Sequence, residues 1–289
     1  ICANFSAVKA ALAQLSPRLG DIRENLDLHL QFIGKARRRK ADLIIFPELS
    51  LTGYTLMDLV PEVAIEPARH PLFRKLIAAS RSIDIVTGFL EEKEKGLFYN
   101  SAAYLAGGKI IHIHRKVFLP TGGMFEEAKF FARGRHFRAF ATSFGKVGLM
   151  ICREFLSYGA GYLLFADGAD LIIVISAAPG RGMAKGDAFA TSRMWELMGE
   201  TISFFSTVFV LYCNRVGIED GKTFAGGSFV FSPAGRRLAK AAEIEEELVL
   251  ADLRLEDIRS ARKKWTFKRD DQPEVILHAL ERIVRDDED

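Results

Sequence analysis

Short apolar segments alternate with amphipathic ones along the chain. The apolar segments are bounded by Gly, Pro and charged residues, which predicts strands at 8–14, 43–46, 85–91, 98–105, 109–117, 140–143, 146–151, 171–176, 208–214, 227–232, 237–241 and 247–252. Apolar positions at helical spacing predict helices from Ile22 (after an Asp21 cap), at 71–82 and at about 187–206. Two short, charge-rich segments, 257–264 and 273–285, follow the last strand. No repeat or linker interrupts the pattern, so we expect one mixed α/β domain over residues 1–289.

Composition and charge argue against several classes of protein. Hydrophobic residues make up 49% of the 289 residues and charged residues 27%, as in a folded globular chain. No apolar run approaches the roughly 20 residues that a membrane helix needs. Lys and Arg number 40 against 37 Asp and Glu, and the net charge of +3 is too small to indicate a nucleic-acid or membrane partner. The basic run 35–40 fits the C-terminal end of a helix, where cations are favourable, better than a nucleic-acid patch.

The cysteines indicate a reducing compartment. Cys2, Cys152 and Cys213 are odd in number and far apart, so neither a disulfide framework nor a cysteine-rich zinc site is expected. The first residues do not resemble a secretory signal, and we expect a cytoplasmic protein. His112 and His114 share one face of a predicted strand, but no third ligand is near, which favours a structural or surface role over a metal site. The glycines form no nucleotide-binding pattern, and no metal or cofactor is expected.

Three polar residues stand at the ends of predicted strands. Glu48 follows 43–46, Lys116 lies at the end of 109–117, and Cys152 follows 146–151. Strand ends in α/β sheets are where distant parts of a chain converge into a site. A thiol becomes a nucleophile if a carboxylate takes its proton and a fixed ammonium stabilises the oxyanion that it creates. Taken singly, each residue has a structural explanation: a buried thiol, a carboxylate at a helix start and a solvated lysine.

The segments around these residues resemble the three motifs of the nitrilase superfamily of carbon–nitrogen hydrolases. Residues 46–54 (FPELSLTGY) are similar to its glutamate motif, 114–120 (HRKVFLP) to its lysine motif and 148–152 (GLMIC) to the approach to its cysteine. Segment 11–17, the acidic pair after the lysine at 126–127, and the late hairpin at 226–228 and 233–235 also resemble the family. The resemblance covers nearly the whole chain in the right order.

This resemblance implies a four-layer α-β-β-α sandwich and a Glu-Lys-Cys triad. Cys152 would attack an amide carbonyl and Glu48 would act as the base. Lys116 would hold the oxyanion, together with the backbone N–H of Arg153. Glu127 matches a second glutamate that positions the lysine and the substrate.

Tyr54, Arg153 and Ser176 are carried over as candidates for substrate binding. Ser176 belongs to segment 175–180, a partial match to the serine-rich substrate loop of one branch of the superfamily.

That branch is the glutaminase domain of glutamine-dependent NAD synthetases. Because the chain printed here stops at Asp289, we expect no synthetase domain and no ATP chemistry. Gly122 stands where those glutaminases commonly have a tyrosine, and Arg153-Glu154 replaces their usual pair after the nucleophile. The resemblance therefore implies a cysteine-dependent amidase for a small non-peptide amide, such as an ω-amide or a glutamine-like one. A nitrilase and a non-catalytic scaffold of the same fold are the alternatives.

The sequence gives less evidence of function for the other residues. Cys213 is expected to pack in the core, and Trp195 is expected to lie in the core or at an interface. Arg181, Met183 and Lys185 either line the mouth of the pocket or belong to a solvated loop. Family members usually associate through helices beside the sandwich and through their C-terminal tails. The tail 260–289 is accordingly expected to serve a homodimer or higher homo-oligomer, or to fold back on its own domain.

Overall fold

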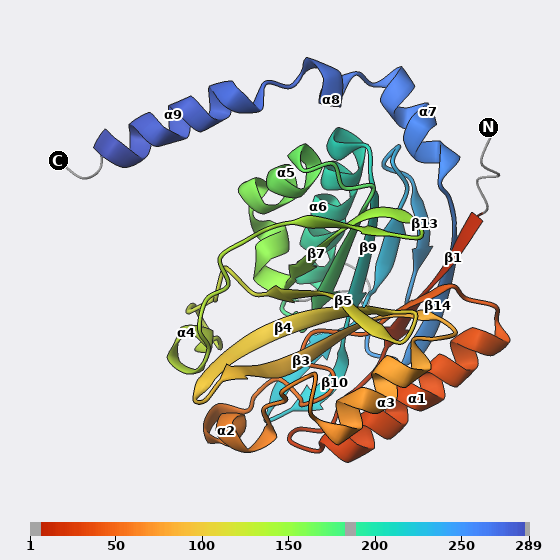
Figure 1. Ribbon diagram of the computed structural model, residues 1–289, viewed down its shortest axis with the longest axis vertical. Helices are drawn as coiled ribbons and strands as arrows, with labels where there is room; N and C mark the ends of the chain where they lie inside the picture. Colours follow the sequence, from red (N-terminus) through yellow and green to blue (C-terminus); the bar gives the residue numbers. More distant parts are fainter. Residues whose placement is uncertain (1–6, 183–188, 287–289) are drawn as a thin grey trace.

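Two six-stranded sheets pack face to face, and each carries helices on its outer face (Figure 1). The computed structural model describes residues 7–182 and 189–286. Helices α1 (Ile22–Arg38) and α3 (Pro71–Ala79) cover one sheet, and α5 (Tyr158–Ala166) and α6 (Ala190–Ser206) cover the other. The four-layer α-β-β-α sandwich expected from the sequence is confirmed.

The first sheet combines the N-terminal half of the chain with one late strand. Its strands β1, β2 and β3 are parallel to one another, and the remaining neighbours are antiparallel. In spatial order the strands are β14 (Glu247–Arg254), β1 (Ala7–Gln14), β2 (Leu43–Ile45), β3 (Asp84–Glu94), β4 (Leu97–Ala106) and β5 (Lys109–Arg115).

The second sheet repeats the same pairing pattern. Strands β7, β8 and β9 are parallel, and antiparallel strands flank them. In spatial order they are β6 (Ala139–Thr142), β7 (Gly145–Ile151), β8 (Leu171–Ser176), β9 (Phe209–Asn214), β12 (Phe229–Phe231) and β13 (Arg237–Lys240). The carboxyl ends of parallel strands are the natural place for a site in both sheets.

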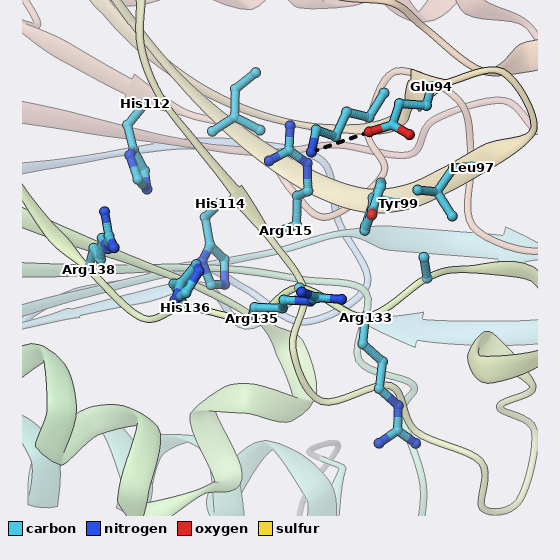
Figure 2. Close-up of a pocket in the computed structure, with 14 residues that line it drawn as sticks. Glu94, Leu97, Tyr99, His112, His114, Arg115, Arg133, Arg135, His136 and Arg138 are labelled. Carbon is cyan, nitrogen blue, oxygen red and sulfur yellow. Dashed lines mark ion pairs between the residues drawn. The ribbon is translucent and has the colours of Figure 1, made fainter.

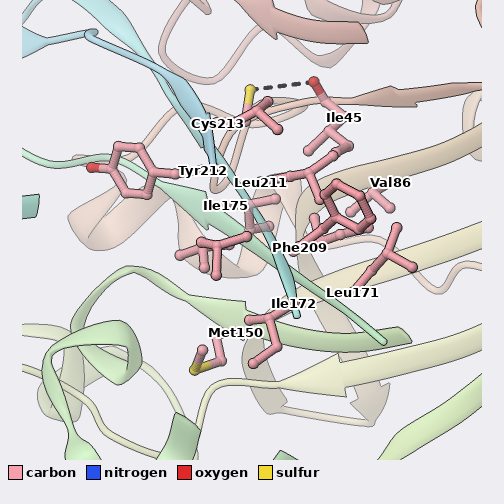
Figure 3. Packing of buried hydrophobic residues seen from close by; sticks show 14 of the residues in the cluster. Ile45, Val86, Met150, Leu171, Ile172, Ile175, Phe209, Leu211, Tyr212 and Cys213 are labelled. Atoms are coloured by element: carbon pink, nitrogen blue, oxygen red, sulfur yellow. Dashed lines mark hydrogen bonds between the residues drawn. The ribbon is translucent and has the colours of Figure 1, made fainter. Parts of the chain in front are cut away.

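The core between the sheets is formed by alternate residues of the parallel strands. Leu12, Ile45 and Val86 of the first sheet belong to one buried cluster with Ile173 and Leu211 of the second (Figure 3). The other faces of β1, β2 and β3 are buried under α1 and α3, so these strands are apolar on both sides. Cys213 lies in this core with its Sγ 3.2 Å from the carbonyl oxygen of Ile45, as expected of a packing residue.

Predicted helix α1 begins as its sequence indicates. The carboxylate of Asp21 accepts a hydrogen bond of 2.9 Å from the backbone N–H of Glu24, which caps the helix. Lys35, Arg37 and Arg38 lie in its last turn, where cations complement the helix dipole.

Several short elements have no clear signal in the sequence. They depend on tertiary contacts, because a single turn is too short to show a period. These elements are η1 (Met57–Leu59), α2 (Val60–Val63), α4 (Glu127–Phe130), η2 (Cys152–Leu156), β10 (Val216–Glu219), β11 (Lys222–Ala225) and α8 (Phe267–Asp270). Helix α5 was also not predicted, because the sequence YGAGYLLFA is apolar on all sides. Strand β5 ends at Arg115, so Lys116 lies one residue beyond the strand rather than within it.

The C-terminal segment packs on the domain before its last helix extends away. Arg262 of α7 (Glu256–Lys264) donates to Asp170 Oδ1 at 2.9 Å, and Phe267 of α8 packs against Phe204 of α6. Helix α9 (Pro273–Asp286) then extends toward the C-terminus (Figure 1). Every described side chain of α9 is exposed, whereas the part of the tail before it, residues 260–271, contacts its own domain. The large exposed apolar side chains on α9 are Val275, Ile276, Leu277, Leu280, Ile283 and Val284. Within residues 7–182 and 189–286, no helix has the length and apolar character of a membrane span.

Candidate active site

Glu48 stands in a tight loop directly after β2, and a glycine of β3 makes room for it. A Cβ atom on Gly88 would lie 2.4 Å from the carbonyl oxygen of Pro47 and 2.8 Å from the Cα of Glu48. Only glycine permits that approach of one backbone to another. The Glu48 side chain is fully buried as a result.

Three donors hold the Glu48 carboxylate. Its Oε1 accepts hydrogen bonds from Lys116 Nζ at 2.6 Å and from Asn100 Nδ2 at 2.7 Å. Its Oε2 accepts one from the backbone N–H of Ala177 at 2.8 Å. Because Ala177 follows β8 and Asn100 lies in β4, the carboxylate is fixed by both sheets.

Lys116 lies between two carboxylates. Its Nζ also donates to Glu127 Oε1 at 2.7 Å, and Tyr54 donates its hydroxyl to that same oxygen at 2.5 Å. Although burial opposes a charge on this lysine, the charges of Glu127 and Glu48 together raise its pKa, so it is an ammonium ion. Burial raises the pKa of Glu127, and its buried Oε2 has no hydrogen-bond partner in the described structure. That free oxygen can accept a proton or a hydrogen bond from a bound molecule.

A second buried ion pair, between Arg215 and Glu219, fixes the backbone at Tyr54. Glu219 in β10 accepts the backbone N–H groups of Tyr54 at 3.0 Å and Thr55 at 2.7 Å. Arg215 pairs with Glu219 at 2.6 Å, and both side chains are almost completely buried. The hairpin β10–β11 therefore fixes the backbone that directs Tyr54 toward Glu127.

Cys152 is the first residue past β7 and begins the 3₁₀ turn η2. Its φ of +46° is a strained conformation for a residue other than glycine, and such strain is common at functional sites. Burial, followed by the charge of Glu48, raises the pKa of the thiol to about 12, while Lys116 and a hydrogen bond with Ser176 oppose the shift. The sulfur is therefore a neutral thiol at pH 7, and it needs a base in order to react.

A small pocket of about 150 Å³ opens on Cys152. Its described lining residues include two arginines, Arg153 and Arg181, and no acidic residue. The remaining lining residues are Pro120, Phe125, Leu156, Pro179, Thr191, Met194 and Trp195. The pocket is smaller than the roughly 300–1,000 Å³ typical of drug-sized ligands, so it suits a small molecule.

Glu154 joins the lysine loop to the cysteine turn. It is fully buried, and its Oε1 accepts the backbone N–H of Val117 at 2.6 Å. Its Oε2 accepts the backbone N–H of Ile151 at 2.6 Å and lies 2.8 Å from His114 Nε2. Since Val117 follows Lys116 and Ile151 precedes Cys152, one carboxylate sets the position of both.

Residues 9–263 match the sequence profile of the carbon–nitrogen hydrolase family. The chain belongs to the carbon–nitrogen hydrolase family. It is 30% identical over 255 residues to the glutamine-dependent NAD(+) synthetase of Acinetobacter baylyi, covering 88% of this chain and 46% of that protein. It is 29% identical over 278 residues to a probable nitrilase of Schizosaccharomyces pombe, and the match covers 93% of this chain and 97% of that protein. A solved carbon–nitrogen hydrolase from Helicobacter pylori superposes with a TM-score of 0.80 at 25% identity, and the superposition covers 94% of this chain and 97% of that chain.

These matches confirm the resemblance to the nitrilase superfamily, including its branch of glutamine-dependent NAD synthetases. The chain spans about half the length of the synthetase relative. Family membership gives the reaction class, hydrolysis of a carbon–nitrogen bond, and leaves the substrate undetermined.

This carbon–nitrogen hydrolase brings together four of the residues expected from its sequence, namely Glu48, Lys116, Glu127 and Cys152. The three candidates for substrate binding lie in different places. Arg153 lines the pocket, whereas Tyr54 lies beyond Glu127 beside a separate cavity of about 40 Å³. Ser176 is fully buried and accepts a hydrogen bond of 3.2 Å from the hydroxyl of Tyr212.

Other residues singled out in the sequence lie in or near the pocket of this carbon–nitrogen hydrolase. Trp195 is buried and stacks on Tyr212 in the core, as expected, and it also lines the pocket beside Cys152. Arg181 lies at the pocket, while Met183 and Lys185 lie outside the described residues. His114 makes a buried hydrogen bond, as a structural role requires. No three His, Cys, Asp or Glu side chains of the described chain gather into a possible metal site.

Sequence reasoning missed three residues that shape the site: Gly88, Asn100 and Glu154. Each had a signal in the sequence. Gly88 interrupts a predicted strand, which indicates close backbone approach, and Asn100 is a polar residue within an apolar strand. Glu154 follows the nucleophile by two residues, but its three contacts could not be read from that position.

Proposed function

We propose that this protein is a cysteine-dependent amidase that hydrolyses a small non-peptide amide to an acid and ammonia. The observation that carries the proposal is the Cys152 thiol at the base of a small pocket, backed by the buried Glu48–Lys116–Glu127 network. Nucleophile, base and ammonium ion are all supplied by side chains of this chain.

The reaction would proceed in two steps. Cys152 Sγ attacks the carbonyl carbon while Glu48 takes the thiol proton, and the oxyanion is stabilised by Lys116 Nζ and the Arg153 backbone N–H. Glu48 then passes the proton to the nitrogen as the carbon–nitrogen bond breaks, which releases ammonia and leaves a thioester. Water gives its proton to Glu48 and attacks the thioester, and the departing sulfur recovers the proton. Glu127 holds Lys116 and offers its free Oε2 to the amide N–H₂.

The charges at the pocket favour a particular amide. Arg153 and Arg181 can bind a carboxylate, while the described lining residues include no acid that would bind an ammonium group. A monoamide of a dicarboxylic acid fits these charges better than glutamine, which carries an additional α-ammonium. Glutamine remains the competing substrate, because the synthetase relatives are named for their dependence on it.

Ammonia release from a panel of substrates tests this proposal. The panel contains succinic and glutaric monoamides, glutamine, neutral amides of the same length and the matching nitriles, with Cys152→Ala as the blank. We expect the monoamides to give the highest kcat/KM and the blank to give no signal. Turnover of nitriles alone would establish a nitrilase instead.

Alkylation distinguishes an enzyme from a non-catalytic scaffold of the same fold. Cys152 lines a pocket beside a base, whereas Cys213 is fully buried in the core. With iodoacetamide and mass spectrometry, an enzyme should be labelled faster at Cys152. Equal, slow labelling at both cysteines, together with silence across the substrate panel, would favour the scaffold.

We also propose that α9 packs against a second copy of this chain. Its apolar side chains are uncovered along the whole helix, and soluble chains rarely expose such a stripe without a partner. Removing residues 272–289 should convert a dimer or larger assembly into a monomer in light scattering. A full-length chain that is already monomeric would contradict this proposal.

A further inference from the structure

Another cavity lies along the edge strand β5, and Cys152 is not among its lining residues. It measures about 750 Å³ and shares no lining residue with the pocket beside Cys152. Figure 2 shows its side chains, which come from the end of β3, the start of β4, β5 and the segment that precedes β6. Its basic lining residues are Lys93, Arg115, Arg133, Arg135 and Arg138, with His112, His114 and His136.

Most of this positive charge is not neutralised. Lys93 lies 3.7 Å from Glu94, the one carboxylate among the described lining residues, and Arg115 pairs with Glu91 at 2.5 Å. In the described part of the chain, Arg133, Arg135 and Arg138 form no ion pair. Burial, and to a smaller extent the nearby charges of His114, Arg138 and Arg115, lower the pKa of His112 to about 4.

The arginines are carried by a fixed backbone. The N–H of Gly134 donates to the carbonyl oxygen of Lys116 at 2.8 Å, and a Cβ at position 134 would lie 1.9 Å from the Arg115 carbonyl oxygen. Phe137 packs against the ring of His114, with 5.6 Å between the centroids. The backbone that carries these arginines is therefore already ordered before a ligand binds. This lowers the conformational entropy that is lost on binding.

The shape and chemistry of the cavity indicate a class of ligand. Its volume lies within the roughly 300–1,000 Å³ range of small-molecule sites. Guanidinium groups bind phosphate oxygens in pairs, and several of them together suit adjacent phosphates. Leu97 and Tyr99 form a less polar wall at the end away from Arg138 (Figure 2).

We propose that this cavity binds a small molecule that carries a diphosphate or triphosphate group. Arg135 and Arg138 would hold the phosphates, and the wall at Tyr99 would contact the remainder of the molecule. This site is independent of the proposed amidase reaction.

Calorimetric titration tests the proposal with inorganic pyrophosphate, tripolyphosphate and ATP as probes at 150 mM NaCl. The wild-type chain should bind at least one of them, and Arg135→Ala/Arg138→Ala should weaken binding more than tenfold. The matched control is Arg37→Ala/Arg38→Ala, which removes the same charge from the exposed end of α1 and should leave affinity unchanged. Equal weakening by both double variants, or no binding by the wild type, would overturn the proposal.

Two further measurements locate the site. Pyrophosphate should protect the cavity arginines from phenylglyoxal in peptide mass spectrometry, and Cys152→Ala should bind as tightly as the wild type. A short single-stranded oligonucleotide that binds more tightly than ATP would reject a small-molecule site in favour of nucleic acid. Protection of Arg153 or Arg181 in place of the cavity arginines would assign the anion to the other pocket.

Discussion

The pocket beside Cys152 and the basic cavity beside β5 use charge in opposite ways. Behind the pocket, Glu48, Lys116 and Glu127 are buried and bonded to one another. In the cavity, Arg135 and Arg138 are exposed and have no acidic partner among the described residues. The two regions are neighbours in the chain, because His114 lines the cavity and Lys116, two residues later, belongs to the buried network.

The difference follows from the free energy of desolvation. A buried charge is tolerated only when it is paired, so the network behind Cys152 is fixed and suited to proton transfer and oxyanion stabilisation. An exposed charge can remain unpaired at little cost and is available to a ligand. Substitutions in the first region should therefore affect turnover and stability, and substitutions in the second should affect binding alone.

The largest expected effect is on catalysis. Glu48→Gln keeps the size of the side chain but removes the proposed base, so turnover of the best amide should fall by about 10²- to 10⁴-fold. Affinity for pyrophosphate should not change. Activity above one-tenth of the wild type would show that another group accepts the proton.

The next effect concerns stability. Lys116→Met leaves Glu48 and Glu127 buried without their shared cation, which should lower the free energy of unfolding by about 3–5 kcal/mol in urea denaturation. Arg135→Met, the matched change in the cavity, should alter it by less than about 0.5 kcal/mol. A similar loss of unfolding free energy in both variants would contradict the claim that the buried, paired charges contribute more to stability than the exposed, unpaired ones.

Gly88→Ala tests whether backbone contact positions Glu48. The added methyl group would force β3 away from the Glu48 loop, which should destabilise the fold by about 1–3 kcal/mol and lower kcat more than it raises KM. Gly34→Ala in α1 is the control, because its Cβ would make only ordinary contact at 3.6 Å. That control should retain activity and gain some helix stability. A Gly88→Ala enzyme with normal kcat would contradict the positioning role.

The smallest expected effect is on KM, and it concerns substrate binding in the pocket rather than the chemical step. Arg181→Ala should raise KM about tenfold for a monoamide that carries a carboxylate, through loss of a charged hydrogen bond. The KM for a neutral amide of equal length should stay the same. If both substrates lose affinity equally, Arg181 contributes packing rather than charge.

The sequence predicted most strands and the principal site residues for different reasons. The strands were visible because apolar runs such as 171–176 are buried on both faces. Glu48, Lys116 and Cys152 were visible because each lies in a family motif. The contacts of Glu154 and Asn100 were not visible, because they join residues that are distant in the chain and meet only after the strands pair.

The basic cavity was hidden for a related reason. Arg133, Arg135 and Arg138 look like ordinary surface residues in the sequence. They become a cavity wall only because Gly134 allows this irregular segment to lie against the carbonyl groups that follow β5. No short sequence pattern indicates that the backbone at Gly134 lies against these carbonyl groups.

The pairing of β1 with β14 has a consequence for the order of events during synthesis. Ala7 lies opposite Arg254, so β1 receives its outer neighbour only after β2 to β13 have been made. At about 5–20 residues per second, the ribosome would leave the outer edge of β1 unpaired for roughly 10 to 50 s. An open apolar edge is a template for unwanted pairing with another chain. The nascent protein is therefore most vulnerable to aggregation in this interval, even though every residue of its active site has been made by the end of it.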